Sequence, residues 1–286
     1  MRNFNLPALG GGVGLRNEHF EDILERRPTC NWFEIIVENF LDFGGYVEKT
    51  FKEIHSHYTI IPHGVCLSLG STDPIDFDFL AKLKNFLDEI KAPWMSDHLC
   101  FTMVDHINLN ELIPIPFSEE SLQNVSERIR VVQDYLERPL LVENVTRYLT
   151  VSDREMSEAE FISRVLEQAN CGLLLDITNV QLNSQFHSFD PREFISSLPL
   201  ERVGQIHLAG WEVASDEQIL DSHDAPVPPE VWDLLRFVLP KTGPSSVLVE
   251  WDNNLPSIER LLHEADKANE LIAEMFPYAE PQTVNS

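Results

Sequence analysis

Short apolar runs alternate with longer amphipathic segments along most of the chain. The runs contain few polar residues, as expected for strands that are covered on both faces. The segments that we interpret as strands are Trp32–Val37, Thr59–His63, Pro93–Ser96, Leu140–Val142, Leu173–Asp176, Val203–His207 and Val247–Glu250. Strands separated by helical segments in this way form a parallel sheet with helical crossovers.

The segments between the strands show helical periodicity. Apolar residues recur three or four positions apart at Leu122, Val125, Ile129, Val132 and Leu136, and again at Phe79, Leu83, Phe86 and Ile90. This spacing places them on one face of a helix. Ser157 and Glu160 have the spacing of a capping box, which predicts that a further helix begins there.

The number of strands favours a closed (β/α)8 barrel of the TIM type over an open sheet. Seven runs are recognised, and an eighth strand is expected in the irregular segment Leu220–Pro229. The glycine-rich segment Gly10–Gly14 does not match the G-x-G-x-x-G pattern, and we interpret it as a flexible N-terminal loop. A barrel of this kind runs to about 250 residues. Residues 1–276 are therefore predicted to form one domain, followed by a flexible C-terminal tail at 277–286.

Residue types that bind metals stand at or just after the carboxyl ends of six consecutive predicted strands. They are His63, His98, Glu143, Asp176, His207 and Glu250. In a barrel these strand ends meet on one face, where the active sites of this architecture lie. Burying so many ionisable groups together is unfavourable unless something neutralises them, and divalent cations are the simplest solution. The sequence therefore predicts a shared metal site in which these six residues are catalytic.

Further oxygen and nitrogen donors follow the later strands. Asp221 and His223 stand two residues apart, so both can face one ion from an extended segment. Asn179 follows Asp176 by three residues, and His187 is a more remote candidate. A ligand set of nitrogen and oxygen atoms without sulfur, as large as this one, is sufficient for two or three ions.

The other histidines and the cysteines are predicted to have surface or structural roles. The histidines expected at the surface are His19, His55, His57, His106 and His263. No C-x-x-C pair occurs among the four cysteines, which are Cys30, Cys66, Cys100 and Cys171. We expect these thiols to be reduced and structural.

Aromatic and basic residues close to the strand ends are candidates for contacts with a substrate. Trp211 and Trp251 closely follow predicted ligands and are placed to wall a pocket. Arg16, Arg147 and Tyr148 are expected on the same side of the barrel. These three side chains offer partners for a substrate carboxylate.

The charge of the chain narrows the range of partners. Among its 286 residues are 47 acidic and 21 basic side chains, which give a formal charge of −26. Such an excess opposes binding to a phosphate backbone, so we expect no nucleic-acid partner. No stretch reaches the roughly 20 apolar residues needed to cross a bilayer. We therefore expect a cytoplasmic protein with no membrane association.

Eight motifs around these residues are specific in combination. They are Gly12–Arg16, His63–Gly70, Ser96–Leu99, Leu141–Asn144, Leu174–Val180, Ile206–Gly210, Asp221–His223 and Val249–Asn253. Together they resemble the multinuclear non-haem iron-dependent oxidative enzymes, the MNIO or DUF692 family, to which the methanobactin-biosynthesis iron oxidase belongs. The resemblance implies a xylose-isomerase-like TIM barrel. It also implies two or three iron ions, Fe2+ or Fe3+, with dioxygen as co-substrate.

The resemblance further implies an activity and a ligand set. Family members modify cysteine residues of ribosomally synthesised precursor peptides, by oxazolone–thioamide or thiooxazole formation or by excision of a cysteine β-carbon. Many of them work with a small partner protein that presents the peptide. The ligands implied here are His63, His98, Glu143, Asp176, Asn179, His207, Asp221, His223 and Glu250. Two positions depart from the family pattern, because Trp211 replaces a second histidine and Asp97 replaces a glutamate.

Three other functions are compatible with the same residues. A metal-dependent hydrolase or endonuclease of this barrel type uses a similar set of ligands, although the acidic charge argues against DNA as its substrate. A sugar isomerase with two divalent ions leaves Asp221 and His223 less well explained. A non-catalytic metal-binding scaffold would hold metal without turnover.

Overall fold

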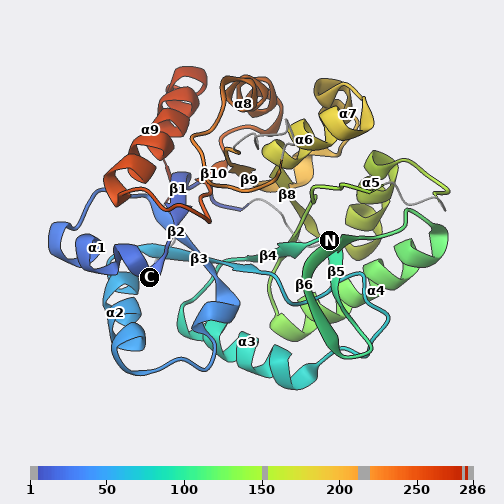
Figure 1. Ribbon diagram of the computed structural model, residues 1–286, viewed down its shortest axis with the longest axis horizontal. Coiled ribbons are helices and arrows are strands. Elements are labelled where there is room, and N and C mark those ends of the chain that lie inside the picture. The colour runs from blue at the N-terminus through green and yellow to red at the C-terminus, as the bar shows by residue number, and fades with distance from the viewer. Residues whose placement is uncertain (1–5, 150–153, 212–219, 279–280, 283–286) are drawn as a thin grey trace.

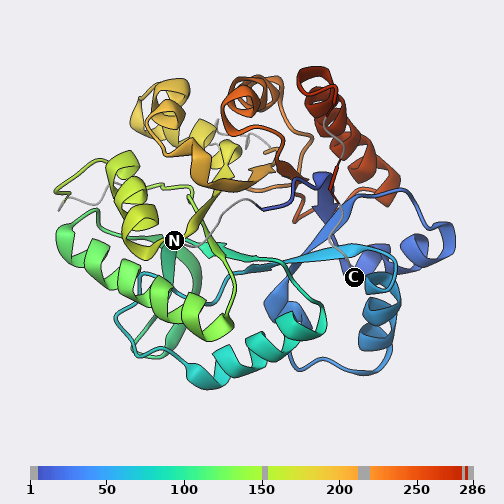
Figure 2. The same ribbon diagram turned by 180° about the vertical axis from the view of Figure 1, so that it is seen from behind.

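The computed structural model describes residues 6–149, 154–211, 220–278 and 281–282. Eight parallel strands form a closed barrel in the order β1-β10-β9-β8-β7-β4-β3-β2, with helices around it (Figure 1 and Figure 2). The barrel strands are β1 (Gly10–Gly14), β2 (Trp32–Ile36), β3 (Thr59–Gly64), β4 (Met95–His98), β7 (Leu140–Glu143), β8 (Gly172–Asp176), β9 (Val203–Leu208) and β10 (Ser246–Val249). The predicted (β/α)8 barrel is confirmed.

Helices cover the outside of the barrel and bury their apolar faces against it. The α-helices are α1 (Phe20–Arg26), α2 (Gly45–His55), α3 (Phe77–Glu89), α4 (Glu119–Leu136), α5 (Glu158–Ala169), α6 (Ile177–His187), α7 (Pro191–Ser196), α8 (Pro229–Thr242) and α9 (Ile258–Met275), and the 3-10 helices are η1 (Asn17–His19), η2 (Val37–Phe40) and η3 (Leu200–Arg202). All five residues of the stripe predicted in α4 are buried. Ser157 is the N-cap of α5, where its side chain accepts the Glu160 N–H at 3.2 Å.

The eighth strand lies at the start of the chain. Gly10–Gly14 is β1, which pairs with β10 and β2 and closes the barrel. The prediction of a flexible loop in this segment is therefore wrong. A side chain at Gly12 would come within 2.4 Å of the Trp32 ring, and one at Gly11 within 2.4 Å of the Ala265 carbonyl oxygen. Glycine is thus required because this strand is packed closely on both faces.

No strand forms where the eighth one is predicted. Residues 220–229 contribute only an isolated bridge between Ala225 and Gly210, and α8 begins at Pro229. The segment instead crosses the end of the barrel and brings Asp221 and His223 to the cavity described below. Its irregular pattern of polar residues and prolines therefore belongs to a loop that carries functional groups.

The interior of the barrel is layered along its axis. An apolar cluster lies inside it, made of Leu9, Trp32, Ile61, Trp94, Leu141, Leu174 and Leu248. Several of these residues stand two positions before a predicted ligand, as Leu141 stands before Glu143. Side chains two positions apart on a strand share a face. The predicted ligands therefore point into the barrel one layer beyond this apolar cluster.

A two-stranded hairpin is inserted between β4 and α4. Its strands are β5 (Cys100–Val104) and β6 (Ile107–Pro114), which pair antiparallel with a shift of register between Phe101 and Met103. Residues 107–112 of β6 are all exposed, and Ile113 and Pro114 are partly buried. The hairpin stands on the side of the barrel that faces the viewer in Figure 1.

The ends of the described chain meet beside the barrel. The backbone N–H of Gln282 donates to the Ala8 carbonyl oxygen at 2.8 Å. Of the predicted tail, residues 279–280 and 283–286 lie outside the described part of the chain. None of the described helices has the length and the apolar character needed to span a membrane.

Candidate metal centre

Residues at the carboxyl ends of the strands form three overlapping groups of potential metal ligands. The groups are His63, His98 and Glu143; Glu143, Asp176 and His207; and Asp176, His223 and Glu250. Within each group, one ligand atom from every residue lies within 4.8 Å of the others. Glu143 and Asp176 each belong to two groups. The three groups therefore form one continuous row.

Glu143 stands at the centre of this row. Its Oε2 atom lies 3.4 Å from His63 Nε2 and 3.5 Å from His98 Nε2. Its Oε1 atom lies 3.5 Å from His207 Nδ1, which is also 3.3 Å from Glu250 Oε2. Glu143 is 2% exposed and His207 is fully buried. One carboxylate oxygen thus faces His63 and His98 and the other faces His207, an arrangement that suits a ligand shared between two ions.

Buried atoms of the row have no hydrogen-bond partner among the described residues. They are His98 Nδ1, Glu143 Oε2, Asp176 Oδ2, His207 Nδ1, Asp221 Oδ1 and His223 Nε2. His223 Nε2 and Asp221 Oδ1 are 2.7 Å apart but lack the alignment of a hydrogen bond. Buried polar atoms without partners are costly. Because nitrogen and oxygen donors converge here, divalent cations fit the set and would satisfy these atoms.

Burial and charge shift the pKa values of neighbouring groups in opposite directions. Burial raises the pKa of Asp176 well above its usual value, and Glu143 raises it further. Burial acts on Glu143 in the same sense, but His98 and His207 outweigh it and hold the pKa of Glu143 well below its usual value. Burial opposes the charged form of His207, yet Glu34 and Glu143 raise its pKa well above its usual value. Such opposed shifts are typical of functional sites.

A cavity of about 500 Å3 opens onto the row of ligands. Its inner wall includes His63, His98, Glu143, Asp221, His223 and Glu250. Its outer wall includes residues 111–114 of the β5–β6 hairpin together with Tyr148 and Leu149. The metal groups are thus reached from outside through a mouth walled by loops, at the end of the barrel where enzymes of this architecture have their active sites.

The family model for the RiPP precursor modification enzymes MbnB/TglH/ChrH matches residues 10–273. The chain belongs to this family. RiPPs are peptides that are made on the ribosome and then modified, so the match agrees with the resemblance carried by the motifs. The family match spans all eight barrel strands and every residue of the three metal groups.

Relatives with curated sequences cover almost the whole chain. A UPF0276 protein of Acaryochloris marina is 40% identical over 268 residues, which is 94% of this chain and 96% of the relative. A UPF0276 protein of Vibrio parahaemolyticus is 36% identical over 278 residues, which is 96% of each chain.

Solved structures with the same fold are sugar epimerases. A D-psicose 3-epimerase of Clostridium cellulolyticum, solved with D-tagatose, has a TM-score of 0.59 at 12% identity and covers 93% of this chain and 99% of its own. A D-allulose 3-epimerase of Methylomonas, solved with D-allulose, has a TM-score of 0.58 at 16% identity and covers 95% and 99%. At these identities the likeness shows the xylose-isomerase-like barrel alone.

Asn179, a predicted ligand, and His187, a more remote candidate, are both held by contacts outside the three metal groups. The Asn179 side-chain oxygen accepts the Thr146 hydroxyl at 2.6 Å, and the Asn179 amide nitrogen donates to the Asn144 carbonyl oxygen at 3.0 Å. Asn179 nevertheless lines the cavity. His187 lies farther away, where its Nε2 atom is 2.7 Å from the Arg147 carbonyl oxygen. The structure does not bring His187 to the cavity wall.

Arg16 contacts the centre through a second residue. Its guanidinium pairs with Asp252 at 2.5 Å, and the other Asp252 oxygen lies 3.1 Å from His223 Nδ1. Asp252 lines the cavity, whereas Arg16 does not. The predicted contact between Arg16 and a substrate stays a prediction. What the structure shows is support for the orientation of His223.

The two tryptophans predicted near the substrate do not line the cavity. Trp211 is half-buried and packs against the apolar core. Trp251 is 5% exposed, and the Arg260 guanidinium lies 5.9 Å from its ring centre. Of the other two candidates, Arg147 forms a buried ion pair with Glu158 at 2.5 Å. Tyr148 does line the cavity, and its hydroxyl accepts the Asp221 N–H at 2.7 Å.

The sequence did not point to the residues that contact the predicted ligands on the side away from the cavity. Glu34 lies 3.2 Å from His207 Nε2, and the Ser96 hydroxyl lies 2.8 Å from His63 Nδ1. Asp97 is buried and accepts the backbone N–H of Leu67 and of His98. Glu34 had one detectable signal, because it is the single charged residue of an otherwise apolar strand.

One of the histidines predicted at the surface is buried. His19 is 4% exposed, and its Nε2 atom lies 2.9 Å from the Pro256 carbonyl oxygen. The acidic residues that follow it, which suggested a solvated position, belong to the outer side of α1. His19 therefore ties the start of α1 to the loop before α9.

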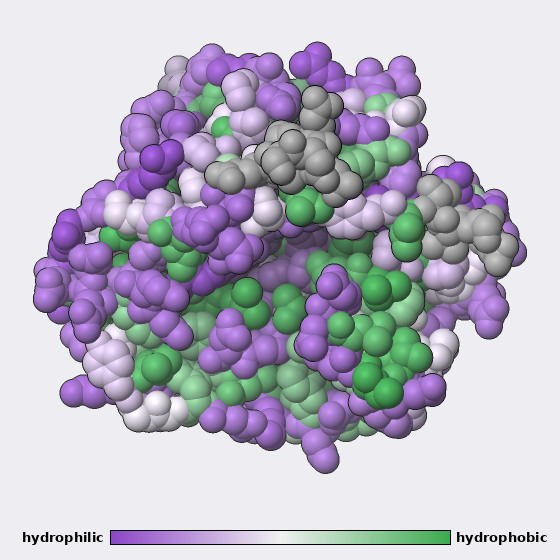
Figure 3. All heavy atoms as spheres, viewed as in Figure 1, coloured by the Kyte–Doolittle hydropathy of each residue, from purple (hydrophilic) through white to green (hydrophobic). Residues whose placement is uncertain are grey.

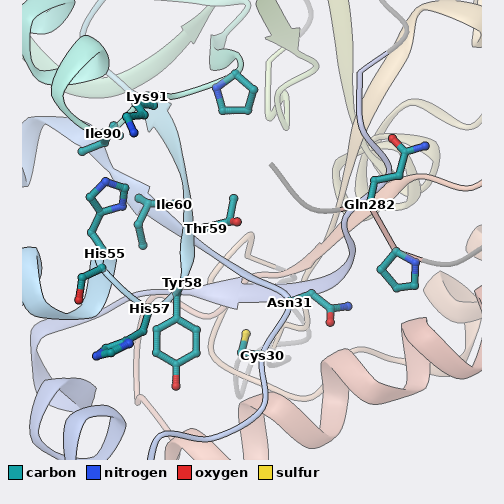
Figure 4. A pocket seen from close by; sticks show the side chains of 13 residues that line it. Cys30, Asn31, His55, His57, Tyr58, Thr59, Ile60, Ile90, Lys91 and Gln282 are labelled. Carbon is teal, nitrogen blue, oxygen red and sulfur yellow. The ribbon is translucent and has the colours of Figure 1, made fainter. Parts of the chain in front are cut away.

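A second cavity, of about 430 Å3, lies at the opposite ends of the strands (Figure 4). It borders Asn31, which precedes β2, and Thr59, which begins β3. His55, His57 and Lys91 lie around it, but none of the three metal groups includes a residue of this cavity. Active sites of TIM barrels lie at the carboxyl ends of the strands. This cavity is therefore not the candidate site.

The four cysteines are free, and we expect them to be unreactive in the folded protein. Burial raises the pKa of Cys30, Cys66 and Cys171 to about 12. At pH 8 such thiols are ionised in on the order of one molecule in 10⁴. Iodoacetamide at pH 8 should thus label native protein far more slowly than denatured protein, as counted by mass spectrometry. Rapid labelling of one site in the native protein would contradict this assignment.

Proposed function

We propose that this protein is an iron-dependent oxidase that uses dioxygen to modify cysteine residues of a RiPP precursor peptide. The observation that carries the proposal is the row of buried imidazole and carboxylate atoms without partners, joined through Glu143 and Asp176 at the inner end of an open cavity. The family of RiPP precursor modification enzymes supplies the class of substrate.

The donor atoms support iron as the metal. Each group combines at least one imidazole with at least one carboxylate, and no group contains sulfur from the protein. Imidazole and carboxylate together are typical ligands of non-haem Fe(II) sites that keep open positions. Bound iron would supply the capacity to hold a cysteine thiolate and to reduce dioxygen. The protein residues would hold the ions close together, because Glu143 and Asp176 each face two groups.

The mouth of the cavity supports a peptide as substrate. Of the ten large hydrophobic side chains that are exposed in the described part of the chain, seven lie on the hairpin or on neighbouring loops: Val104, Ile107, Leu109, Leu112, Tyr148, Leu149 and Leu220. Figure 3 shows a hollow with an apolar surface beside it over the hairpin. Exposed apolar surface of this kind marks an interaction site. We refer to these seven residues as the apolar rim.

The apolar rim and the acidic interior suit different parts of one peptide. Leu112, Tyr148 and Leu149 line the cavity itself, so the rim continues into the site. Apolar side chains that flank the modified cysteine would pack on the rim, while the thiol reaches the ligands. A polyol, as bound by the sugar epimerases, offers little apolar surface to such a mouth. We further propose that a small partner protein presents the peptide, as the resemblance carried by the motifs implies.

Reconstitution under anaerobic conditions tests the function. The protein would be loaded with Fe2+ and mixed with a precursor peptide from the same genomic neighbourhood and its candidate partner protein. On admission of air, mass spectrometry should show an oxygen-dependent mass change at cysteine. Samples loaded with Zn2+ and samples kept anaerobic serve as controls. The same product in all arms would reject the oxidase, and bound iron without turnover would favour a metal-binding scaffold.

The apolar rim makes a separate prediction about affinity. Replacing Leu109 and Leu112 together with serine should weaken peptide binding roughly tenfold. Full burial of a leucine contributes about 1.5–3 kcal/mol, but these two are only 39% and 37% exposed, so covering both contributes about 1.1–2.3 kcal/mol. Fluorescence anisotropy of a labelled peptide measures the Kd. Phe77→Ser is the matched control, since Phe77 is 51% exposed and does not line the cavity. Equal losses in both variants, or none in the double variant, would remove the rim from substrate binding.

A further inference from the structure

Three polar side chains are connected below the metal centre, inside the barrel. Glu34 is on β2, Gln205 is on β9, and Trp94 directly precedes β4. Glu34 is 3% exposed, and Gln205 and Trp94 are fully buried. A buried carboxyl or amide group is costly unless it is hydrogen-bonded. It is therefore important which of these side chains donates and which accepts in each hydrogen bond.

The indole of Trp94 fixes the direction of the first two bonds. An indole N–H can only donate, so the atom of Gln205 that lies 2.9 Å from Trp94 Nε1 is the accepting oxygen. The amide nitrogen of Gln205 must then face Glu34, where it donates to Oε2 at 2.5 Å. Glu34 is the acceptor at the end of this sequence of bonds.

Glu34 is also in contact with a predicted metal ligand. His207 Nε2 lies 3.2 Å from both oxygens of Glu34 and 2.8 Å from the amide nitrogen of Gln205. Two proton positions satisfy these distances. Either Nε2–H donates to Glu34, or Nε2 accepts from Gln205 and the proton sits on Nδ1. A carboxylate is the stronger partner, which favours the first arrangement.

The other side of the same imidazole faces the metal groups. His207 Nδ1 is buried without a hydrogen-bond partner among the described residues. It lies 3.5 Å from Glu143 Oε1 and 3.3 Å from Glu250 Oε2. A proton on Nδ1 would thus point at the space where the ligand atoms converge. With the proton on Nε2, the Nδ1 lone pair is available to a cation.

We propose that Glu34 is a positioning residue of the metal centre: it accepts Nε2–H of His207, so that Nδ1 binds the metal, and Gln205 and Trp94 hold it in place. The inference rests on the proposed metal centre and adds to it a tautomer and the residue that sets it. Outer hydrogen bonds of this kind orient a ligating histidine and increase its basicity.

Glu34 differs from the residues that contact the outer ring nitrogens of the other histidines. His63 Nδ1 lies 2.8 Å from the neutral Ser96 hydroxyl, and His223 Nδ1 lies 3.1 Å from Asp252, which is paired with Arg16. Among the residues that the structure describes, Glu34 pairs with no cationic side chain apart from His207 itself. His207 is therefore the only cationic group that shares the Glu34 carboxylate, beside the neutral amide of Gln205, among the described residues. His207 is expected to be the most strongly electron-donating imidazole of the row.

Metal titration of variants tests the assignment. We expect Glu34→Gln to keep its fold by circular dichroism and to bind one of the ions 10- to 100-fold more weakly, as measured with Zn2+ against a competing chelator. His207→Ala should weaken the same ion, and adding Glu34→Gln to it should have no further effect. A merely structural role would give the same additional loss in both backgrounds. Glu264→Gln, at a buried glutamate of α9, is the matched control.

Histidine NMR supplies a readout that does not depend on affinity. In the Zn2+-loaded protein with 15N-labelled histidine, His207 should carry its proton on Nε2, and Glu34→Gln should disturb that signal. Trp94→Phe, which removes the donor to Gln205, should produce a smaller loss at the same ion, and it serves if Glu34→Gln does not fold. A proton on Nδ1, or wild-type affinity in Glu34→Gln, overturns the role of Glu34. Absence of any Zn2+ or Fe2+ binding in the unaltered protein overturns the metal centre as well.

Discussion

Replacing Glu143 with glutamine should remove metal from two of the three groups and reduce oxygen-dependent turnover by at least about 10³-fold. Both oxygens of Glu143 face donors, since Oε2 lies near His63 and His98 and Oε1 lies near His207. An amide keeps the shape but replaces one oxygen by a nitrogen that cannot bind a cation. A loss of about 4 kcal/mol of electrostatic stabilisation in the transition state corresponds to a 10³-fold fall in turnover. Metal content by elemental analysis and turnover by mass spectrometry measure the two effects.

A buried glutamate elsewhere provides the comparison. Glu264 is 5% exposed and pairs with Lys267 at 2.7 Å on the outer helix α9. Glu264→Gln should lower stability without changing metal content or turnover. If Glu143→Gln retains its full metal content and activity, Glu143 does not bridge the groups. If Glu264→Gln loses as much metal as Glu143→Gln, the effect reflects the loss of a buried carboxylate in general.

Metal binding should raise the melting temperature by on the order of 10 °C. A ligand present at about 1,000 times its Kd stabilises the folded state by about 4 kcal/mol, and each kcal/mol shifts the Tm of a large domain by about 2–4 °C. The physical reason is local, because a cation would satisfy buried atoms of Glu143, Asp176 and His207 that lack partners. Differential scanning fluorimetry with Fe2+ or Zn2+, before and after addition of EDTA, measures the shift.

The shift depends on the row of ligands and not on histidines in general. His57→Ala removes an exposed histidine at the second cavity, and its metal-dependent shift should equal that of the unaltered protein. His63→Ala should lose a large part of it. A shift that survives in His63→Ala and in Glu143→Gln would place the bound metal outside the row.

Much of the site could be predicted because polar residues interrupt an apolar pattern at regular places. Glu143 and Asp176 each end a run of apolar residues, and in a parallel barrel such positions converge. The structure brings them together with His63, His207 and the other strand-end residues. His223 lies beside Asp176 and Glu250, although the segment that carries it is a loop and not a strand.

What sequence reasoning missed has two physical causes. β1 consists of glycines and one valine, so it has almost no side-chain pattern by which a strand could be recognised. Its contacts with Trp32 and Ala265 are made by partners distant in the sequence. Glu34 lies inside an apolar run and not at its end, so the rule that found the ligands did not select it. Its role follows only from the distance to His207.

The likeness to the sugar epimerases shows how one barrel serves different substrates. The closed ring of strands is common to them, and in this chain residues 111–114 of the β5–β6 hairpin wall the cavity that opens onto the ligands. Function in such folds resides in the loops around a shared frame. Changes of specificity within the family are therefore expected first in the hairpin and in the segment around Tyr148.

The pairing of β1 with β10 joins the first strand of the barrel to the last. Because Gly11 pairs with Val247, the ring cannot close until residues 246–249 have left the ribosome. Glu250, a member of the third ligand group, emerges at the same late stage. The third ligand group can consequently be complete only once Glu250 has joined the strands made earlier, so the proposed set of ions is expected to fill after the barrel has closed.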